Sequence, residues 1–164
     1  AFAAGSLTKS DFITHDYAFI TYDKDTHEPQ YNIIIPRGTP FPTPKEFWKR
    51  QLTPTCPLGE PERIFKLLIC EIGRAHSVDQ EFVWDGSGRL HSLKEENEKK
   101  PLVIPLNESN PTLGYLNPPH PPSDKSARLE VSFMVNEERW LCSTVYDLKT
   151  RKQLLVDEPV YRLK

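Results

Sequence analysis

Glycine, cysteine and net charge are all scarce in this chain. Its 164 residues include seven glycines and three cysteines, and the formal net charge is −2. A charge this small gives no general attraction to nucleic acid or to an anionic membrane. Cys56, Cys70 and Cys142 are odd in number and widely spaced, so they imply neither a disulfide framework nor a zinc site.

Long apolar runs are missing as well. No stretch of the sequence approaches the ~20 apolar residues that a membrane-spanning helix needs. No charged start followed by an apolar segment marks a secretory signal. We therefore expect a cytoplasmic protein whose partners include neither a membrane nor nucleic acid.

Motifs that carry catalysis or hold a cofactor are also absent. The histidines fall in separate segments without metal-ligand spacing: His15, His27, His76, His91 and His120. The chain has no glycine-rich phosphate loop and no Gly-x-Ser-x-Gly motif. Asp85-Gly86-Ser87-Gly88 is better explained as a hairpin turn between residues 81–84 and 89–93. The sequence therefore predicts no catalytic residue, no metal site and no cofactor in this chain.

Proline, by contrast, is abundant. Sixteen prolines are spread along the chain and leave little room for long helices, so we expect an all-β fold. The run Ile33-Ile34-Ile35 predicts a strand that is buried on both faces and paired on both sides. Pro36 ends that strand, and Gly38 allows the turn into a rigid, proline-rich corner.

The other strands are indicated by alternation and by turn residues. Residues 17–22 and 30–35 predict a hairpin around a polar turn. In the strand predicted at 64–72, Phe65, Leu67 and Ile69 should share one face.

Residues 127–135 alternate most clearly. Leu129, Val131, Phe133 and Val135 should point one way, while Arg128, Glu130 and Ser132 point the other. Residues 140–147 would form the partner strand, followed by a turn over 147–152 and closing strands at 153–156 and 160–163.

Three blocks in the same order resemble the substrate-binding domain of the seventy-kilodalton heat-shock chaperones (heat shock protein 70). The first is the strand and corner Ile34-Ile35-Pro36-Arg37-Gly38-Thr39-Pro40-Phe41-Pro42-Thr43. The second is Leu129-Glu130-Val131-Ser132-Phe133, and the third is the turn Asp147-Leu148-Lys149-Thr150-Arg151-Lys152. The chain departs from the family in two turns, where it has Arg151 and residues 136–139 instead of glycine.

The resemblance implies an antiparallel β-sandwich of the chaperone peptide-binding type, spanning residues 10–164. Residues 1–9 would be a linker or an expression remnant, and about 78–110 an insertion atypical of the family. The implied function is that of a molecular chaperone of the stress response, which binds extended hydrophobic segments of unfolded proteins. ATP would be bound by a separate nucleotide-binding domain, which would be a further partner together with co-chaperones.

The resemblance also implies peptide-contacting residues. By position, Phe19 and Thr21 would lie on the first groove strand, and Tyr22 and Leu52 would arch over the peptide. Trp48, Phe65 and Leu67 would line an apolar pocket. The competing interpretation is that Phe19, Phe65 and Leu67 are plain core residues.

A second function remains open from the sequence. The chain could be a β domain that docks one specific partner, or regulates an attached ATPase, without general affinity for peptides. An open apolar channel with unpaired backbone groups would favour peptide binding, whereas a channel filled by Tyr22 or Trp48 would favour docking.

Overall fold

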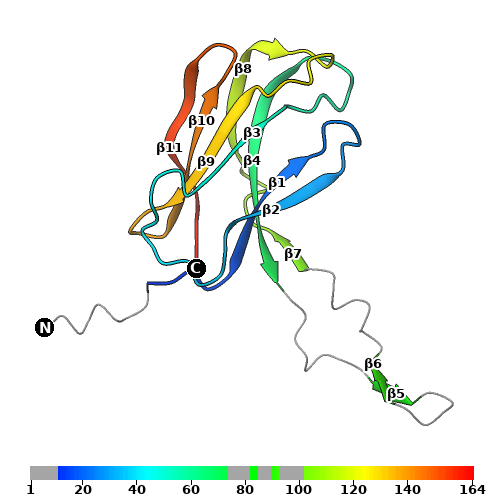
Figure 1. The fold of residues 1–164 in the computed structure, drawn as a ribbon, viewed down its shortest axis with the longest axis vertical. Coiled ribbons are helices and arrows are strands. Elements are labelled where there is room, and N and C mark those ends of the chain that lie inside the picture. The colour runs from blue at the N-terminus through cyan, green and yellow to red at the C-terminus, as the bar shows by residue number, and fades with distance from the viewer. Residues whose placement is uncertain (1–10, 74–81, 85–89, 93–101) are drawn as a thin grey trace, which may run out of the picture.

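The structure of the chain is a computed structural model that describes residues 11–73, 82–84, 90–92 and 102–164. Within these residues every regular element is a β-strand, and the expectation of an all-β fold is confirmed. Two antiparallel sheets face each other as a sandwich (Figure 1). No helix in the described part of the chain is long and apolar enough to cross a membrane.

The first sheet has five strands. From its outer edge inward it contains β2 (Pro29–Ile35), β1 (Asp16–Tyr22), β4 (Glu62–Gly73) and β7 (Leu102–Pro105), and β8 (Thr112–His120) pairs with another part of β4. β4 is twelve residues long, so one end of it pairs with β7 and the other with β8.

The second sheet has four strands. They are, in order, β11 (Lys152–Arg162), β10 (Trp140–Asp147), β9 (Leu129–Val135) and β3 (Trp48–Leu52). The hairpin expected within 81–93 is present as β5 (Phe82–Trp84) paired with β6 (Leu90–Ser92). Its turn and the expected linker at 1–9 lie outside the described residues.

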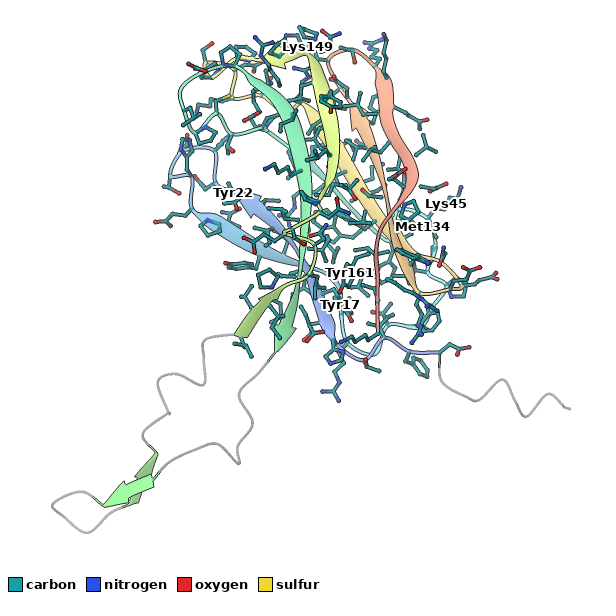
Figure 2. All side chains as sticks on the ribbon, turned by 180° about the vertical axis from the view of Figure 1, so that it is seen from behind. Tyr17, Tyr22, Lys45, Met134, Lys149 and Tyr161 are labelled. Carbon is teal, nitrogen blue, oxygen red and sulfur yellow. The ribbon has the colours of Figure 1, made fainter. Side chains whose placement is uncertain are left out.

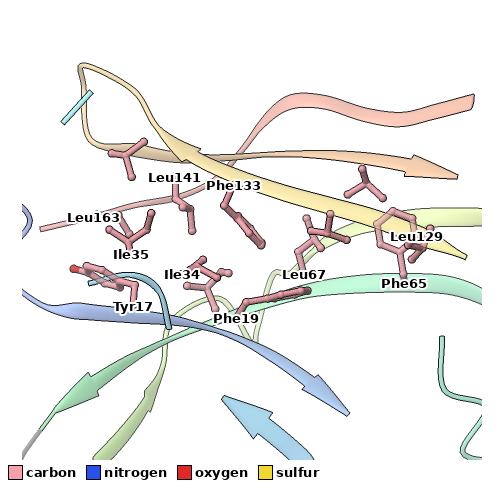
Figure 3. Packing of buried hydrophobic residues seen from close by; sticks show 14 of the residues in the cluster. Tyr17, Phe19, Ile34, Ile35, Phe65, Leu67, Leu129, Phe133, Leu141 and Leu163 are labelled. Atoms are coloured by element: carbon pink, nitrogen blue, oxygen red, sulfur yellow. The ribbon is translucent and has the colours of Figure 1, made fainter. Parts of the chain in front are cut away.

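Alternating apolar residues on the two sheets build the core. Phe65, Leu67 and Ile69 are buried from the first sheet, and Val131 and Phe133 from the second. Figure 3 shows these side chains meeting between the layers. The predicted alternation of β4 and β9 is therefore confirmed for their apolar faces.

Two expectations about burial are wrong. β2 is an edge strand and not a central one, and Ile33 is 42% exposed while Ile34 and Ile35 are buried. A register shift opposite Tyr17 and Ala18 inserts an extra residue into β2. Such a bulge breaks the simple alternation of faces, so Ile34 and Ile35 are both directed inward.

Arg128 is the second exception, because the alternation places it on the outward face whereas only 2% of it is exposed. Its Nε and Nη2 donate to the carboxylate of Asp147 at 2.8 and 3.0 Å, and Nη2 also donates to the carbonyl of Pro118 at 2.8 Å. A buried charge requires such partners.

Polar side chains replace glycine in the two turns of the second sheet. Arg139 and Arg151 adopt positive φ angles of 68° and 60°. Asn136 Oδ1 accepts from the N–H groups of Glu138 and Trp140, and Asp147 Oδ1 accepts from that of Lys149. These bonds hold the turns in a conformation that would otherwise favour glycine.

Part of the expected insertion belongs to the sheet. β7 lies within the predicted range 78–110, yet it pairs with Cys70–Gly73 of β4. The side chain of Asn107 in the same range also hydrogen-bonds β4. The described end of the range is therefore an integral part of the fold.

Candidate peptide groove

The candidate site starts where β1 separates from β4. The two strands pair from Asp16 opposite Ile72 to Ile20 opposite Leu68, and no further. The preceding part of β4, from Glu62 to Leu67, pairs with β8 on one side only. On its other side no described strand continues the ladder.

The direction of the backbone groups in this part of β4 follows from its neighbours. Asn107 Oδ1 accepts from the N–H of Ile69 at 2.9 Å, and Asn107 Nδ2 donates to the carbonyl of Leu67 at 2.7 Å. The backbone groups of Leu67 and Ile69 thus point toward the side of β4 on which β7 and β8 lie. Because successive strand residues point their backbone groups to opposite sides, those of Ile64 and Lys66 point toward the open side.

A groove of about 810 Å³ lies along this open edge. Its apolar lining comes from both sheets: Phe19, Leu52, Phe65, Leu67, Leu129 and Val131. Consecutive residues of three segments, 19–24, 50–55 and 64–68, line it as well. When neighbouring residues of a strand both border a groove, the strand presents its backbone edge.

Gly114 fixes the position of Phe65 on the groove wall. The two residues lie opposite each other on β8 and β4. A Cβ atom on Gly114 would come within 2.0 Å of Cζ of the Phe65 ring. The ring therefore lies directly over the glycine, an arrangement that any side chain at position 114 would prevent.

An aromatic cluster supports the groove from the core. Phe19 contacts Phe133 edge to face at a centroid distance of 5.0 Å, and Trp48 lies 5.9 Å from Phe19 and 5.8 Å from Phe133. The guanidinium of Arg50 lies over the Trp48 ring at 5.3 Å, a cation–π arrangement. Trp48 thus anchors β3 and does not fill the groove.

Loops at one end of the groove are joined by polar contacts. Lys125 Nζ donates to the carbonyl of Lys24 at 3.1 Å, and Thr53 Oγ1 donates to the carbonyl of Ser126 at 3.0 Å. Asp23 begins the β1–β2 turn, and backbone N–H groups of the turn donate to its carboxylate. These hydrogen bonds favour the charged carboxylate and lower the pKa of Asp23.

The ion pair of Arg128 and Asp147 holds the same end together. The N–H of Arg128 donates to the carbonyl of Leu52, and its carbonyl accepts from the N–H of Leu148. Burial by itself would raise the pKa of Asp147, but the hydrogen bonds from Arg128 and from backbone N–H groups outweigh it and lower that pKa. The pair thereby connects the end of β3, the start of β9 and the turn after β10.

The structure brings most of the predicted peptide-contacting residues together. Phe19, Thr21, Tyr22, Leu52, Phe65 and Leu67 all line the groove, whereas Trp48 does not. Phe19, Phe65 and Leu67 also belong to the buried core, so the groove floor and the core are one surface.

Sequence reasoning missed two kinds of groove residue. Leu129 and Val131 were interpreted only as core, although they close the groove floor. The backbone edge at Ile64 and Lys66 carries no side-chain signal, since an unpaired strand edge depends on where β1 ends. The alternation of β9 could have indicated the first kind but not the second.

Groups suited to other chemistry are few in the described residues. No cluster of three or more His, Cys, Asp or Glu side chains could hold a metal ion there. Cys70 is buried in the first sheet, and desolvation raises the pKa of its thiol to about 11, which makes it a poor nucleophile at neutral pH.

Comparison with known proteins gives no relative to set beside this site, because no family model, curated protein or solved structure matches the chain.

Proposed function

We propose that this domain binds extended, apolar segments of unfolded polypeptides in the groove along β4. The observation that carries the proposal is the unpaired edge of β4 beside a groove of about 810 Å³ with an apolar floor. An extended peptide placed there could pair with the backbone groups of Lys66 and with the carbonyl of Ile64, whose N–H donates to the carboxylate of Glu62 at 3.4 Å. The side chains of the peptide would then enter the apolar floor.

The shape of the groove favours this function over partner docking. Tyr22, at the end of β1 (Figure 2), and Leu52 line the groove, and Trp48 is not part of its lining, so these three side chains leave the channel open. The resemblance to the heat-shock chaperones points to the same activity. Within such a protein this chain would supply peptide binding, and ATP hydrolysis would reside in a separate domain.

The cysteines support a cytoplasmic location. All three are free in the structure, as expected of a protein in a reducing compartment.

Fluorescence anisotropy with a labelled Leu-rich peptide tests the proposal. When the wild-type domain is added at ~100 μM, the anisotropy of the labelled peptide should rise, as expected for an affinity in the micromolar range. The substitution Tyr22→Ala should weaken peptide binding, and Tyr31→Ala is the matched control. The two tyrosines are 45% and 44% exposed, but only Tyr22 lines the groove.

Backbone recognition needs its own variant. Lys66→Pro removes an N–H group that faces the open side and no ladder bond with β8, whereas Lys66→Ala keeps the N–H. Loss of one hydrogen bond predicts about tenfold weaker binding for the proline variant alone. A folded wild type that gives no anisotropy change would exclude general peptide binding and favour the docking function.

A further inference from the structure

The outer edge of β2 carries none of the charges found on the two edge strands of the second sheet, β3 and β11. β2 ends its sheet, and Figure 1 shows no element beyond it. Between Pro29 and Pro36 its residues carry no charge: Gln30, Tyr31, Asn32, Ile33, Ile34 and Ile35. Tyr31 and Ile33 are 44% and 42% exposed.

The two edge strands of the second sheet carry features that oppose strand pairing. β3 has Lys49 and Arg50 on its exposed residues. β11 has register shifts along its length and contains Asp157 and Pro159. Charges, prolines and bulges are the usual protection of a sheet edge, and the central residues of β2 lack the first two. Its bulge lies toward its end, at Ile34.

The hydrogen-bonding groups on this edge belong to Tyr31 and Ile33. In the β1–β2 turn the N–H of Asp23 donates to the carbonyl of Glu28. Moving two residues away from the turn along each strand leads to the pair of Thr21 and Gln30. Because hydrogen-bonded pairs alternate along an antiparallel ladder, the backbone groups of Gln30 and Asn32 point toward β1. The backbone groups of Tyr31 and Ile33 consequently point away from the sheet.

This edge is complementary to itself. If two copies of β2 meet antiparallel with Asn32 opposite Asn32, Tyr31 of each copy lies opposite Ile33 of the other. Each such pair can exchange both its N–H and its C=O groups, as hydrogen-bonded positions require. The tyrosine and isoleucine side chains would then meet on one face as aromatic and β-branched cross-strand pairs.

We propose that this edge is a self-association surface, where β2 pairs with β2 of a second copy about a two-fold axis. The two five-stranded sheets would join into one continuous sheet. Of β2, Gln30 lines the groove, whereas the pairing would use the outer backbone edge at Tyr31 and Ile33, so it does not depend on the proposed peptide binding.

Cysteine cross-linking tests the register. Asn32→Cys would place two thiols at a non-hydrogen-bonded antiparallel pair, with a Cα–Cα distance of ~4.5 Å, which a disulfide can bridge. Gln30→Cys is the matched control on the same strand, because its copies would lie about 13 Å apart. Both variants are made with Cys56→Ser, because Cys56 is the one partly exposed native cysteine.

Mild oxidation should give a covalent dimer with Asn32→Cys and little with Gln30→Cys. Equal yields from the two variants, or none from either, would overturn the register. Circular dichroism of each variant verifies the fold, since Asn32 also hydrogen-bonds Phe19 and Thr21.

Sedimentation equilibrium tests the association independently of any cysteine. The wild type should gain mass as its concentration rises from ~5 to ~500 μM, as expected for a small, weak interface. Ile33→Lys should reduce self-association at least tenfold, because a charge on the edge opposes pairing. Val156→Lys, a similar change at an exposed position of β11, should not. A wild type of constant monomer mass over this range, or equal effects of the two lysines, would refute the proposal.

Discussion

The two halves of β4 have the same kind of sequence and different surroundings. In the half from Leu68 to Gly73, β1 pairs with Leu68–Ile72 on one side and β7 pairs with Cys70–Gly73 on the other. From Glu62 to Leu67 it is paired with β8 alone. Phe65, Leu67 and Ile69 nevertheless share one buried face.

This difference shows how a sandwich can hold a groove without losing its core. The half paired on both sides is stabilised by apolar packing and by its ladders to β1 and β7. Beside the half paired on one side, polar contacts hold the neighbouring segments together. Among them is the ion pair of Arg128 and Asp147. The groove is the space that the absent strand would fill.

The largest expected effect comes from breaking the ion pair at the open half. Asp147→Ala leaves the buried guanidinium of Arg128 without its charged partner and should cost about 3–5 kcal/mol of the free energy of unfolding. Urea unfolding measures this cost. The double variant Arg128→Met, Asp147→Leu should recover most of the loss, and failure to recover would assign the loss to the turn that Asp147 caps.

A cavity in the half paired on both sides should have the next largest effect. Ile69→Ala removes a fully buried side chain and should cost about 2–5 kcal/mol, whereas Leu52→Ala at the groove border should cost less. Urea unfolding of both variants would compare the two regions directly. If Leu52→Ala costs as much as Ile69→Ala, the groove border is as tightly packed as the core.

A methyl group at Gly114 should act on the groove itself. Gly114→Ala would displace the Phe65 ring, at a cost of about 1–3 kcal/mol, and should also change peptide affinity. Gly73→Ala is the control, because its Cβ would meet Leu102 at an ordinary 3.7 Å. Thermal unfolding and peptide anisotropy measure the two effects, and equal behaviour of the two alanines would contradict the contact between Phe65 and Gly114.

Acid should lower the free energy of unfolding by a fraction of the loss expected for Asp147→Ala. The pKa of Asp147 is lowered from its usual 3.8 in the folded state, so the charged carboxylate stabilises the fold above that pH. This contribution is lost as the pH falls below 3.8 through the lower folded value. Urea unfolding between pH 6 and pH 3 measures it, and Asp147→Asn should show a smaller loss over the same range.

The sequence predicted the strands well because alternation and turn residues are local signals. Phe65, Leu67 and Ile69 on β4 and the four apolar residues of β9 lie as their spacing indicates. The burial of Arg128 could not be predicted in this way, because its partner Asp147 is nineteen residues away. Nor could the edge position of β2, since a run of isoleucines suits a central strand equally well.

The groove was predictable only in part, for the same reason. Its side chains were named through a resemblance, and six of the seven lie on its lining. Its open backbone depends on where β1 leaves β4, which tertiary packing decides. Trp48, the seventh, packs against Phe19 and Phe133 and is not part of the lining.

The pairing of β4 with β7 has a consequence for how the chain could vary. Gly73 lies opposite Leu102 in that ladder, so the chain leaves the sheet and re-enters it at neighbouring points. Because loop-closure entropy grows only slowly with length, lengthening the chain between these two points should cost the fold little free energy. The sandwich therefore sets only a weak limit on how long the connection between Gly73 and Leu102 can be.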